Sequence, residues 1–208
     1  MSSPVVVIDY GLNNIWSVTS ALNHLRIAHF VSSSPVEIEK AKVLILPGIG
    51  SFRKAMNSIR ELKIDEIIVS KVLGEKSIFL GICLGMQLMG NSGKEDGISK
   101  GLGLIDAEVD KFTFEEVNGQ KVPHIGFNQV RFNADSKLFH GLPENADFYF
   151  VHSYRMLPGN LRGNLATCDY GVQFLAAYEN ANIFATQFHP EKSQTNGLKL
   201  LAASAKSR

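Results

Sequence analysis

The sequence predicts an α/β fold, in which a doubly wound, mostly parallel central sheet with helices on both faces is followed by an antiparallel β-rich extension. Up to Met89, short apolar runs rich in β-branched residues alternate with segments of helical spacing. Such runs are typical of strands buried on both faces of a parallel sheet. Beyond Met89, a polar glycine-rich loop leads into shorter segments with the alternation of antiparallel strands.

Val5–Ile8 is the first continuous apolar run and predicts a buried strand. Ile15, Val18, Leu22 and Leu25 then recur at helical spacing, which completes a strand–helix unit. The same signals predict the remaining elements of this half: strands at 28–31 and 43–46, and helices beginning at the capping box 34–37, at 52–60 and at 65–73.

The second half is predicted to be β-rich. An Asn-Gly pair at 117–120 predicts a hairpin between strands at 110–114 and 121–124. Further strands are predicted at 148–151, 166–168, 175–178 and 183–187, and a final helix at 195–205. These strands should extend the parallel core and bring His189 beside Cys83.

Composition limits the classes of function. With 208 residues, 45% of them hydrophobic, and no repeat or linker, we expect a single domain over residues 1–208. The net charge of +1 offers no electrostatic footprint for nucleic acid or an anionic membrane. No apolar run has the length of a membrane span, no signal peptide is evident, and two cysteines do not make a disulfide scaffold. We therefore expect a cytoplasmic protein with no metal and no cofactor.

The run from Ile78 to Met89 predicts a strand, a sharp turn and a helix, with Cys83 at the turn between Gly81 and Gly85. Such a turn exposes a nucleophile in a strained conformation, and glycines let the neighbouring backbone close around it. The helix amino terminus favours the thiolate over the thiol. A buried structural cysteine is the alternative interpretation, but the Gly-x-Cys-x-Gly pattern favours a nucleophile.

A nucleophilic cysteine needs a base and a group that orients the base. An apolar strand ends in His189-Pro190-Glu191, where the carboxylate is close enough in sequence to reach the imidazole. By itself His-x-Glu also fits a solvated strand end. Together with Cys83, it predicts a catalytic triad.

The strand at 43–46 ends in Pro-Gly-Ile-Gly, which fits either ordinary turn chemistry or an oxyanion hole. In the second interpretation, backbone amides of Ile49 or Gly50 act with that of Leu84, next to the nucleophile, on the tetrahedral intermediate.

The motifs Gly-Ile-Cys-Leu-Gly-Met-Gln at 81–87 and Gln-Phe-His-Pro-Glu-Lys-Ser at 187–193 resemble the signatures of class I, triad-type glutamine amidotransferases. Motifs at 8–11, 46–52, 123–128 and 149–154 narrow the resemblance to the glutaminase subunits of imidazole glycerol phosphate synthases. The resemblance implies hydrolysis of L-glutamine to glutamate and ammonia through a Cys83 thioester. It also implies a substrate pocket lined by Gln87, Glu95, His152, Ser153 and Tyr154, of which Glu95 meets the substrate ammonium group.

The chain has no Walker-type loop and no synthase domain, so a partner must consume the ammonia. The resemblance implies a heterodimer with a (β/α)8-barrel cyclase that makes imidazole glycerol phosphate and AICAR in histidine biosynthesis. Asn14 and Lys192 match positions that face that barrel, and Phe127 belongs to a motif at or near the interface. Asn13 and Phe127 depart from the usual Gly and Trp of these subunits.

These departures leave open a paralogue that supplies ammonia to an enzyme amidating bacterial surface sugars. Two other interpretations are a free-standing cysteine hydrolase, such as a peptidase or γ-glutamyl hydrolase, and a non-catalytic regulatory subunit. The motifs at 123–128 and 149–154 argue against the first, and the complete triad argues against the second.

Overall fold

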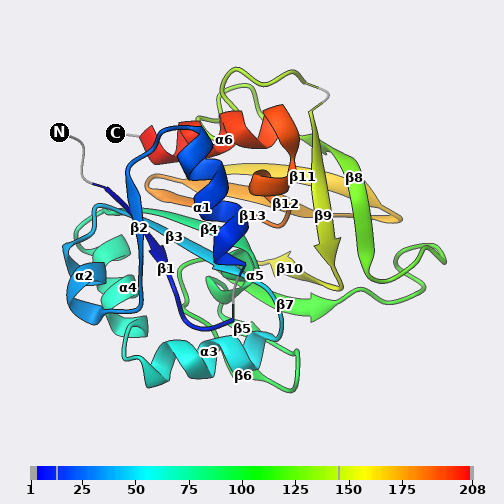
Figure 1. Ribbon diagram of the computed structural model, residues 1–208. Coiled ribbons are helices and arrows are strands. Elements are labelled where there is room, and N and C mark those ends of the chain that lie inside the picture. Colours follow the sequence, from blue (N-terminus) through cyan, green and yellow to red (C-terminus); the bar gives the residue numbers. More distant parts are fainter. Residues whose placement is uncertain (1–3, 13, 145, 207–208) are drawn as a thin grey trace.

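The computed structural model describes residues 4–12, 14–144 and 146–206. Its centre is a nine-stranded sheet in the order β2-β1-β3-β4-β13-β12-β11-β8-β9 (Figure 1). The strands of this sheet are β1 (Val5–Ile8), β2 (His29–Ser32), β3 (Val43–Gly48), β4 (Ile78–Cys83), β8 (His124–Arg131), β9 (Asp147–His152), β11 (Asn164–Tyr170), β12 (Val172–Asn180) and β13 (Ile183–Thr186).

The sheet changes character part-way across. The five strands from β2 to β13 are parallel to one another, and the strands from β12 to β9 are antiparallel to their neighbours. The predicted α/β fold with an antiparallel extension is therefore confirmed. Because β13 runs parallel beside β4, both strands end at the same edge of the sheet.

Helices cover both faces of the parallel part (Figure 1). On one face lie α1 (Ile15–His24) and α6 (Gln194–Lys206), and on the other lie α2 (Pro35–Lys40), α3 (Phe52–Glu61) and α4 (Asp65–Leu73). Alternate residues of β1 point to opposite faces. Val5 and Val7 pack with α1 and α6, while Val6 and Ile8 pack with the other three helices. Burial on both faces explains why β1 is apolar throughout.

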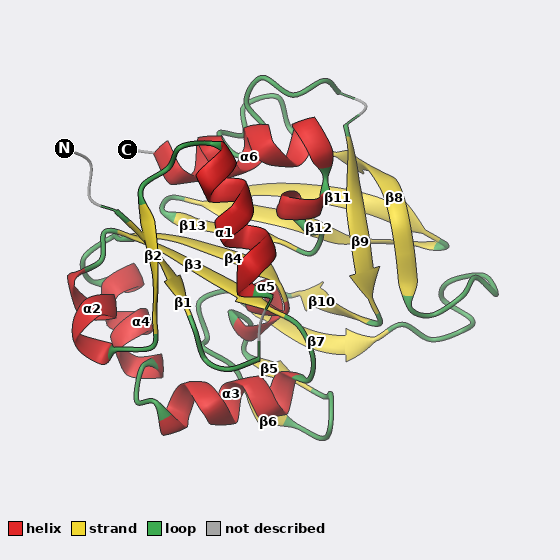
Figure 2. Cartoon of the chain, in the orientation of Figure 1, coloured by secondary structure: helices red, strands yellow, loops and turns green. Residues whose placement is uncertain are grey.

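A second sheet of four strands, in the order β10-β7-β5-β6, lies beside α3 (Figure 2). It consists of β5 (Ser92–Gly93), β6 (Ser99–Lys100), β7 (Ala107–Lys111) and β10 (Tyr154–Pro158). In this sheet β5 is parallel to β7, whereas β7 is antiparallel to β10 and β5 is antiparallel to β6. The sequence did not predict this sheet, since two of its strands have only two residues.

The hairpin predicted around the Asn-Gly pair at 117–120 is wrong. β7 pairs with β5 and β10, whereas β8 pairs with β9 and β11. Asn118 and Gly119 do adopt positive φ, but they end a helical turn in which the Gly119 amide bonds the Phe114 carbonyl. Residues with positive φ occur at the ends of helical turns as well as in hairpins. The Asn-Gly pair by itself therefore does not distinguish the two structures.

Candidate active site

Cys83 is the last residue of β4, and the short helix α5 (Leu84–Leu88) begins directly after it. Its φ of 54° and ψ of −108° are strained for a residue with a side chain. A Cβ on Gly85 would lie 1.7 Å from the Leu46 carbonyl oxygen, and one on Gly81 would lie 2.8 Å from the Gly85 backbone. The predicted strand–turn–helix is confirmed, and both glycines are required by close backbone contact.

His189 reaches this turn through the pairing of β13 with β4. Thr186 is paired with Ile82, and the chain continues past it to His189 and the 3₁₀ turn Pro190–Lys192. His189 Nδ1 lies 2.7 Å from Glu191 Oε1, and both side chains are 2% exposed. Nε2 of His189 is buried and has no hydrogen-bond partner among the described residues. The imidazole is thus held by Glu191, with its second nitrogen free for proton transfer.

Three groups set the protonation of this site. Burial by itself would lower the pKa of His189, but interaction with Cys83 and Glu191 outweighs it and raises that pKa to about 10. The arrangement therefore favours an imidazolium between the Cys83 sulfur and the Glu191 carboxylate. A cationic histidine beside a cysteine is an arrangement that can activate the cysteine as a nucleophile.

A cavity of about 300 Å³ opens in front of the nucleophile. It collects ten of the predicted site residues in one place: Ile49, Gly50, Cys83, Leu84, Gln87, Glu95, His152, Ser153, Tyr154 and His189. Glu191 contacts the site through His189. The cavity is large enough for a small amino acid substrate, and its wall also includes Pro123 and Val151.

The predicted oxyanion residues are not all turned toward the cavity. The Ile49 amide donates a 3.3 Å hydrogen bond to the Leu12 carbonyl, so this amide is engaged elsewhere. Gly50 has a φ of +95°, which favours glycine. A Cβ on Gly48 would lie 2.3 Å from the Tyr10 hydroxyl, so the strand before Ile49 is tightly enclosed.

Gln87 and Glu95 enter the cavity from different elements. Gln87 is 4% exposed, and its Nε2 donates to the Tyr154 carbonyl at 2.9 Å and to Gln187 Oε1 at 3.0 Å. Glu95 accepts a 3.0 Å hydrogen bond from the Phe52 amide at the start of α3. Burial raises the pKa of Glu95. A substrate cation would be a favourable partner for a carboxylate in such an environment.

His152 is almost fully buried, and its Nδ1 donates to the Tyr154 carbonyl at 2.8 Å. Its Nε2 must then accept from His124 Nδ1, 3.1 Å away. Burial lowers the pKa of His152 to about 3 and that of His124 to about 4, so both rings are neutral. His152 thus borders the cavity as a hydrogen-bonded wall residue.

Sequence reasoning missed two residues of this network. His124 is one, because its partner His152 lies on a different strand. Gln187 is the other: it is fully buried, and its Nε2 lies 3.7 Å from Cys83 Sγ. Gln187 stands inside the second signature motif, and a polar residue at the end of an apolar strand was the available signal.

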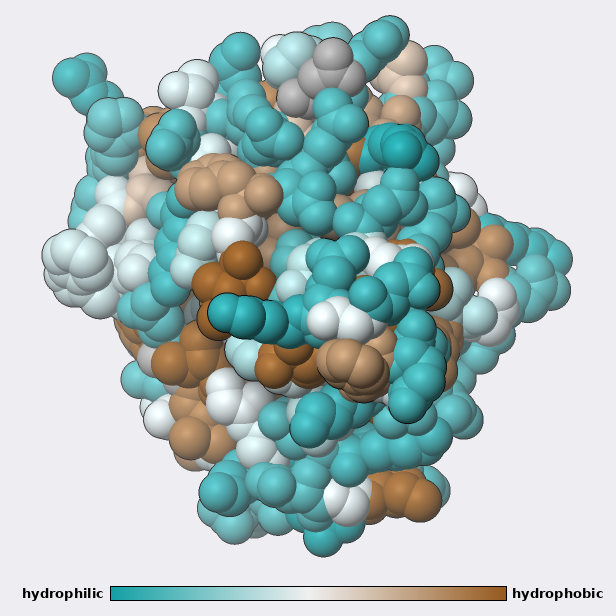
Figure 3. Space-filling model, turned by 90° about the vertical axis from the view of Figure 1, so that its right-hand side faces the viewer, coloured by the Kyte–Doolittle hydropathy of each residue, from teal (hydrophilic) through white to brown (hydrophobic). Residues whose placement is uncertain are grey.

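The three predicted interface residues lie outside the cavity. Asn14 donates to Ser17 Oγ at the start of α1, and Phe127 is 51% exposed against the ring of Tyr149. Lys192 is exposed, with its Nζ 6.0 Å from the same tyrosine ring. Asn13 lies outside the described residues. Figure 3 views the molecule from the right-hand side of Figure 1, where β8 and β9 lie, and shows apolar side chains gathered in the middle of a hydrophilic surface.

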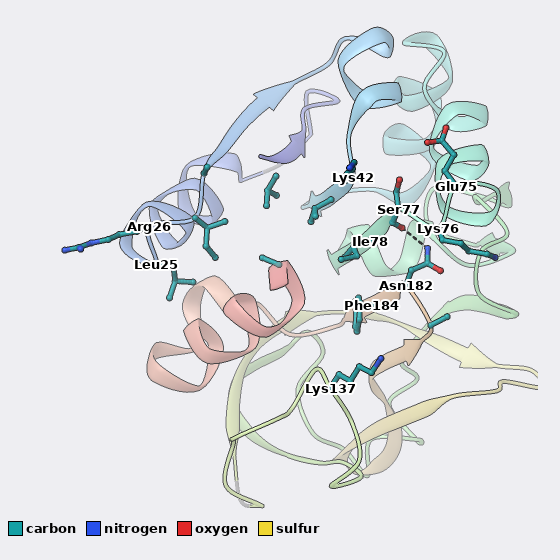
Figure 4. Close-up of a pocket in the computed structure, with 16 residues that line it drawn as sticks. Leu25, Arg26, Lys42, Glu75, Lys76, Ser77, Ile78, Lys137, Asn182 and Phe184 are labelled. Atoms are coloured by element: carbon teal, nitrogen blue, oxygen red, sulfur yellow. Dashed lines mark hydrogen bonds between the residues drawn. The ribbon is translucent and has the colours of Figure 1, made fainter. Parts of the chain in front are cut away.

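A larger cavity, of about 950 Å³, lies near the starts of β1, β3 and β4. Figure 4 shows Lys137 extending toward it, while Arg26 points away. Its ionisable lining residues are Arg26, Lys42, Glu75, Lys76 and Lys137. Among the described residues, no cysteine or histidine lines this cavity, whereas Cys83 and His189 line the smaller one, so we place the chemistry at the smaller cavity.

The family model for class-I glutamine amidotransferases matches residues 6–206. The chain belongs to this family. This amidotransferase is 43% identical to imidazole glycerol phosphate synthase subunit HisH 1 of Campylobacter jejuni over 95% of its length and 96% of the relative's. It is 42% identical to subunit HisH of Bacillus subtilis, over 94% of its own length and 92% of the relative's. Family membership makes it a glutamine-hydrolysing enzyme.

Solved structures agree on the fold. A putative GMP synthase protein from Thermoplasma acidophilum superposes with a TM-score of 0.70 at 18% identity, covering 99% of this chain and 94% of that one. A glutamine amidotransferase from Thermotoga maritima gives a TM-score of 0.64 at 18% identity, covering 99% and 83% of the two chains. Within the described ranges, no helix is long and apolar enough to cross a membrane.

Proposed function

We propose that this amidotransferase is the glutaminase subunit of an imidazole glycerol phosphate synthase and that Cys83, His189 and Glu191 carry out its chemistry. The observation that carries the proposal is the unpartnered His189 Nε2 beside the strained Cys83, with Glu191 fixing the other ring nitrogen. The full-length similarity to HisH subunits supports the assignment to this synthase.

In the proposed reaction, the Cys83 thiolate attacks the side-chain carboxamide carbon of L-glutamine and forms a tetrahedral intermediate. His189 transfers its proton to the departing nitrogen, ammonia leaves, and a γ-glutamyl thioester remains. Neutral His189 then takes a proton from water as the water attacks the thioester. Collapse of the second intermediate breaks the carbon–sulfur bond, which releases glutamate and regenerates the thiolate and the imidazolium.

The remaining cavity residues would bind substrate. Leu84 and either Ile49 or Gly50 would donate backbone hydrogen bonds to the oxyanion. Glu95 would pair with the substrate ammonium group, and Gln87 and the His152–Tyr154 segment would hold the rest of the amino acid backbone. No metal or cofactor takes part in this mechanism.

The ammonia would pass to a (β/α)8-barrel cyclase bound as a heterodimer, which would form imidazole glycerol phosphate and AICAR. Exposed Phe127 and Lys192, together with Asn14, would lie at or near that interface. Residues 1–208 would act as one amidotransferase domain, because the nine-stranded sheet joins strands from both halves of the chain. A cytoplasmic location is consistent with the two free cysteines.

The test is reconstitution with the cyclase subunit from the same organism. We expect glutamine-dependent formation of imidazole glycerol phosphate, and a stable complex in size-exclusion chromatography. If the chain instead binds and supplies an enzyme that amidates surface sugars, the histidine assignment is wrong. The exposed phenylalanine at position 127, where tryptophan is usual, is the feature that favours this second candidate.

A further inference from the structure

The Gln187 side chain connects the nucleophile to the wall of the cavity. Its carboxamide is fully buried, with Nε2 3.7 Å from Cys83 Sγ and Oε1 3.0 Å from Gln87 Nε2. Its backbone amide donates to the Ala176 carbonyl at 2.8 Å, which fixes the residue against β12. Buried carboxamides in proteins have hydrogen-bond partners, and one partner of this carboxamide is the Cys83 sulfur.

The direction of these hydrogen bonds follows from their chain of partners. The Tyr154 carbonyl can only accept, so the Gln87 atom 2.9 Å from it is the amide nitrogen. That same nitrogen donates to Gln187, whose facing atom must be the carbonyl oxygen. The NH₂ group of Gln187 is therefore turned toward Cys83. Gln187 serves the sulfur as a donor.

We propose that Gln187 stabilises the ionised form of Cys83 and orients its sulfur for attack, an inference that rests on the proposed role of Cys83 as nucleophile. A donor to the charged form of an acid favours ionisation. Unlike His189, a carboxamide does not exchange its proton during the cycle. Gln187 thus supports the thiolate in the resting enzyme and again when the thioester breaks down and the sulfur leaves. Gln87 holds the carboxamide in the donating orientation.

The experiment is the pH dependence of Cys83 alkylation by iodoacetamide in the full-length chain, with the modified residue identified by mass spectrometry. Burial raises the pKa of Cys168 to about 12, so this thiol stays unreactive near neutral pH. Gln187→Met keeps the length of the side chain and removes the donor. Gln187→Glu places an anion beside the sulfur. Gln173→Met, at an exposed position on β12, is the matched control.

We expect Gln187→Met to raise the apparent pKa of Cys83 by about one unit, which lowers alkylation below that pKa roughly tenfold. Gln187→Glu should raise it further, and Gln173→Met should leave it unchanged. An unchanged Cys83 pKa in a Gln187→Met chain with wild-type unfolding would overturn the role of Gln187. An unreactive Cys83 in the wild type would instead overturn the nucleophile assignment, and this inference with it.

A second measurement uses the unsubstituted side chain, in case Gln187→Met does not fold. In ¹⁵N spectra of the wild type, the Gln187 carboxamide resonances should shift with the titration of Cys83. In Cys83→Ser they should stay constant over the same pH range. Resonances in the wild type that do not respond to that titration would also overturn the inference.

Discussion

The proton-transfer side of the cavity and its oxyanion side are built differently. Cys83, His189 and Glu191 are nearly excluded from solvent and held by close glycine contacts, a strained turn and a 2.7 Å hydrogen bond. Across the cavity, Ile49 is 46% exposed and its amide is bonded to Leu12 at 3.3 Å. One side is thus assembled, whereas on the other side Ile49, if it is the oxyanion donor that we propose, would need a peptide rotation before its amide could donate. We infer that catalytic competence is regulated at the oxyanion side.

The assembled side is tested most severely by Cys83→Ala. Glutaminase activity should be lost completely, because no other described cysteine borders the cavity. Glutamine-derived affinity labels should modify Cys83 and spare Cys168. The matched control is Cys168→Ala, which should retain turnover. Glutamine hydrolysis by the Cys83→Ala chain in complex with its partner would contradict the assignment of the triad.

Glu191→Gln should produce the next largest effect. Glu191 orients His189 and stabilises its charge without exchanging a proton, so its loss should cost roughly 10³–10⁴ in turnover, less than loss of Cys83 or His189. Turnover of Glu191→Gln, His189→Ala and Cys83→Ala should be measured in the same complex. A Glu191→Gln enzyme slower than Cys83→Ala would contradict this order.

Restricting the oxyanion strand should give a smaller effect. A missing backbone donor costs roughly 3–4 kcal/mol, or about 10²–10³ in rate. The isolated chain should therefore be slow, and the partner with an acceptor analogue should accelerate it. Gly50→Ala should reduce that acceleration, because a φ of +95° strains any residue with a Cβ. If the isolated chain hydrolyses glutamine as fast as the liganded complex, the oxyanion side of the cavity does not need the partner to become competent.

The smallest effect is on stability. The pKa of His189 is raised from 6.5 to about 10, so stabilisation from its charged form is complete below pH 6.5 and is lost as the pH rises toward 10. Removing the sulfur in Cys83→Ala should weaken this dependence. Urea unfolding at intervals between pH 6.5 and 10 measures it. Equal slopes for the wild type and Cys83→Ala would argue against the ion pair.

Much of the architecture was predictable because its signals are local. Apolar β-branched runs such as Val5–Ile8 are the direct consequence of burial on both faces of a sheet. The Gly-x-Cys-x-Gly turn was likewise visible in the sequence. A Cβ at position 85 would lie 1.7 Å from the Leu46 carbonyl oxygen, so only glycine fits there. His-Pro-Glu at 189–191 was visible too, because its 2.7 Å contact lies within one turn of chain.

Other features were decided by contacts between distant segments. The Asn-Gly pair at 118–119 was locally compatible with a hairpin, but β7 and β8 found different partners in two sheets. The direction of the Ile49 amide depends on Leu12, and the donor role of Gln187 depends on Gln87 and Tyr154. Sequence determined which residues could do this chemistry. Tertiary structure alone decided which way their hydrogen bonds point, because each partner is supplied by a segment remote in the chain.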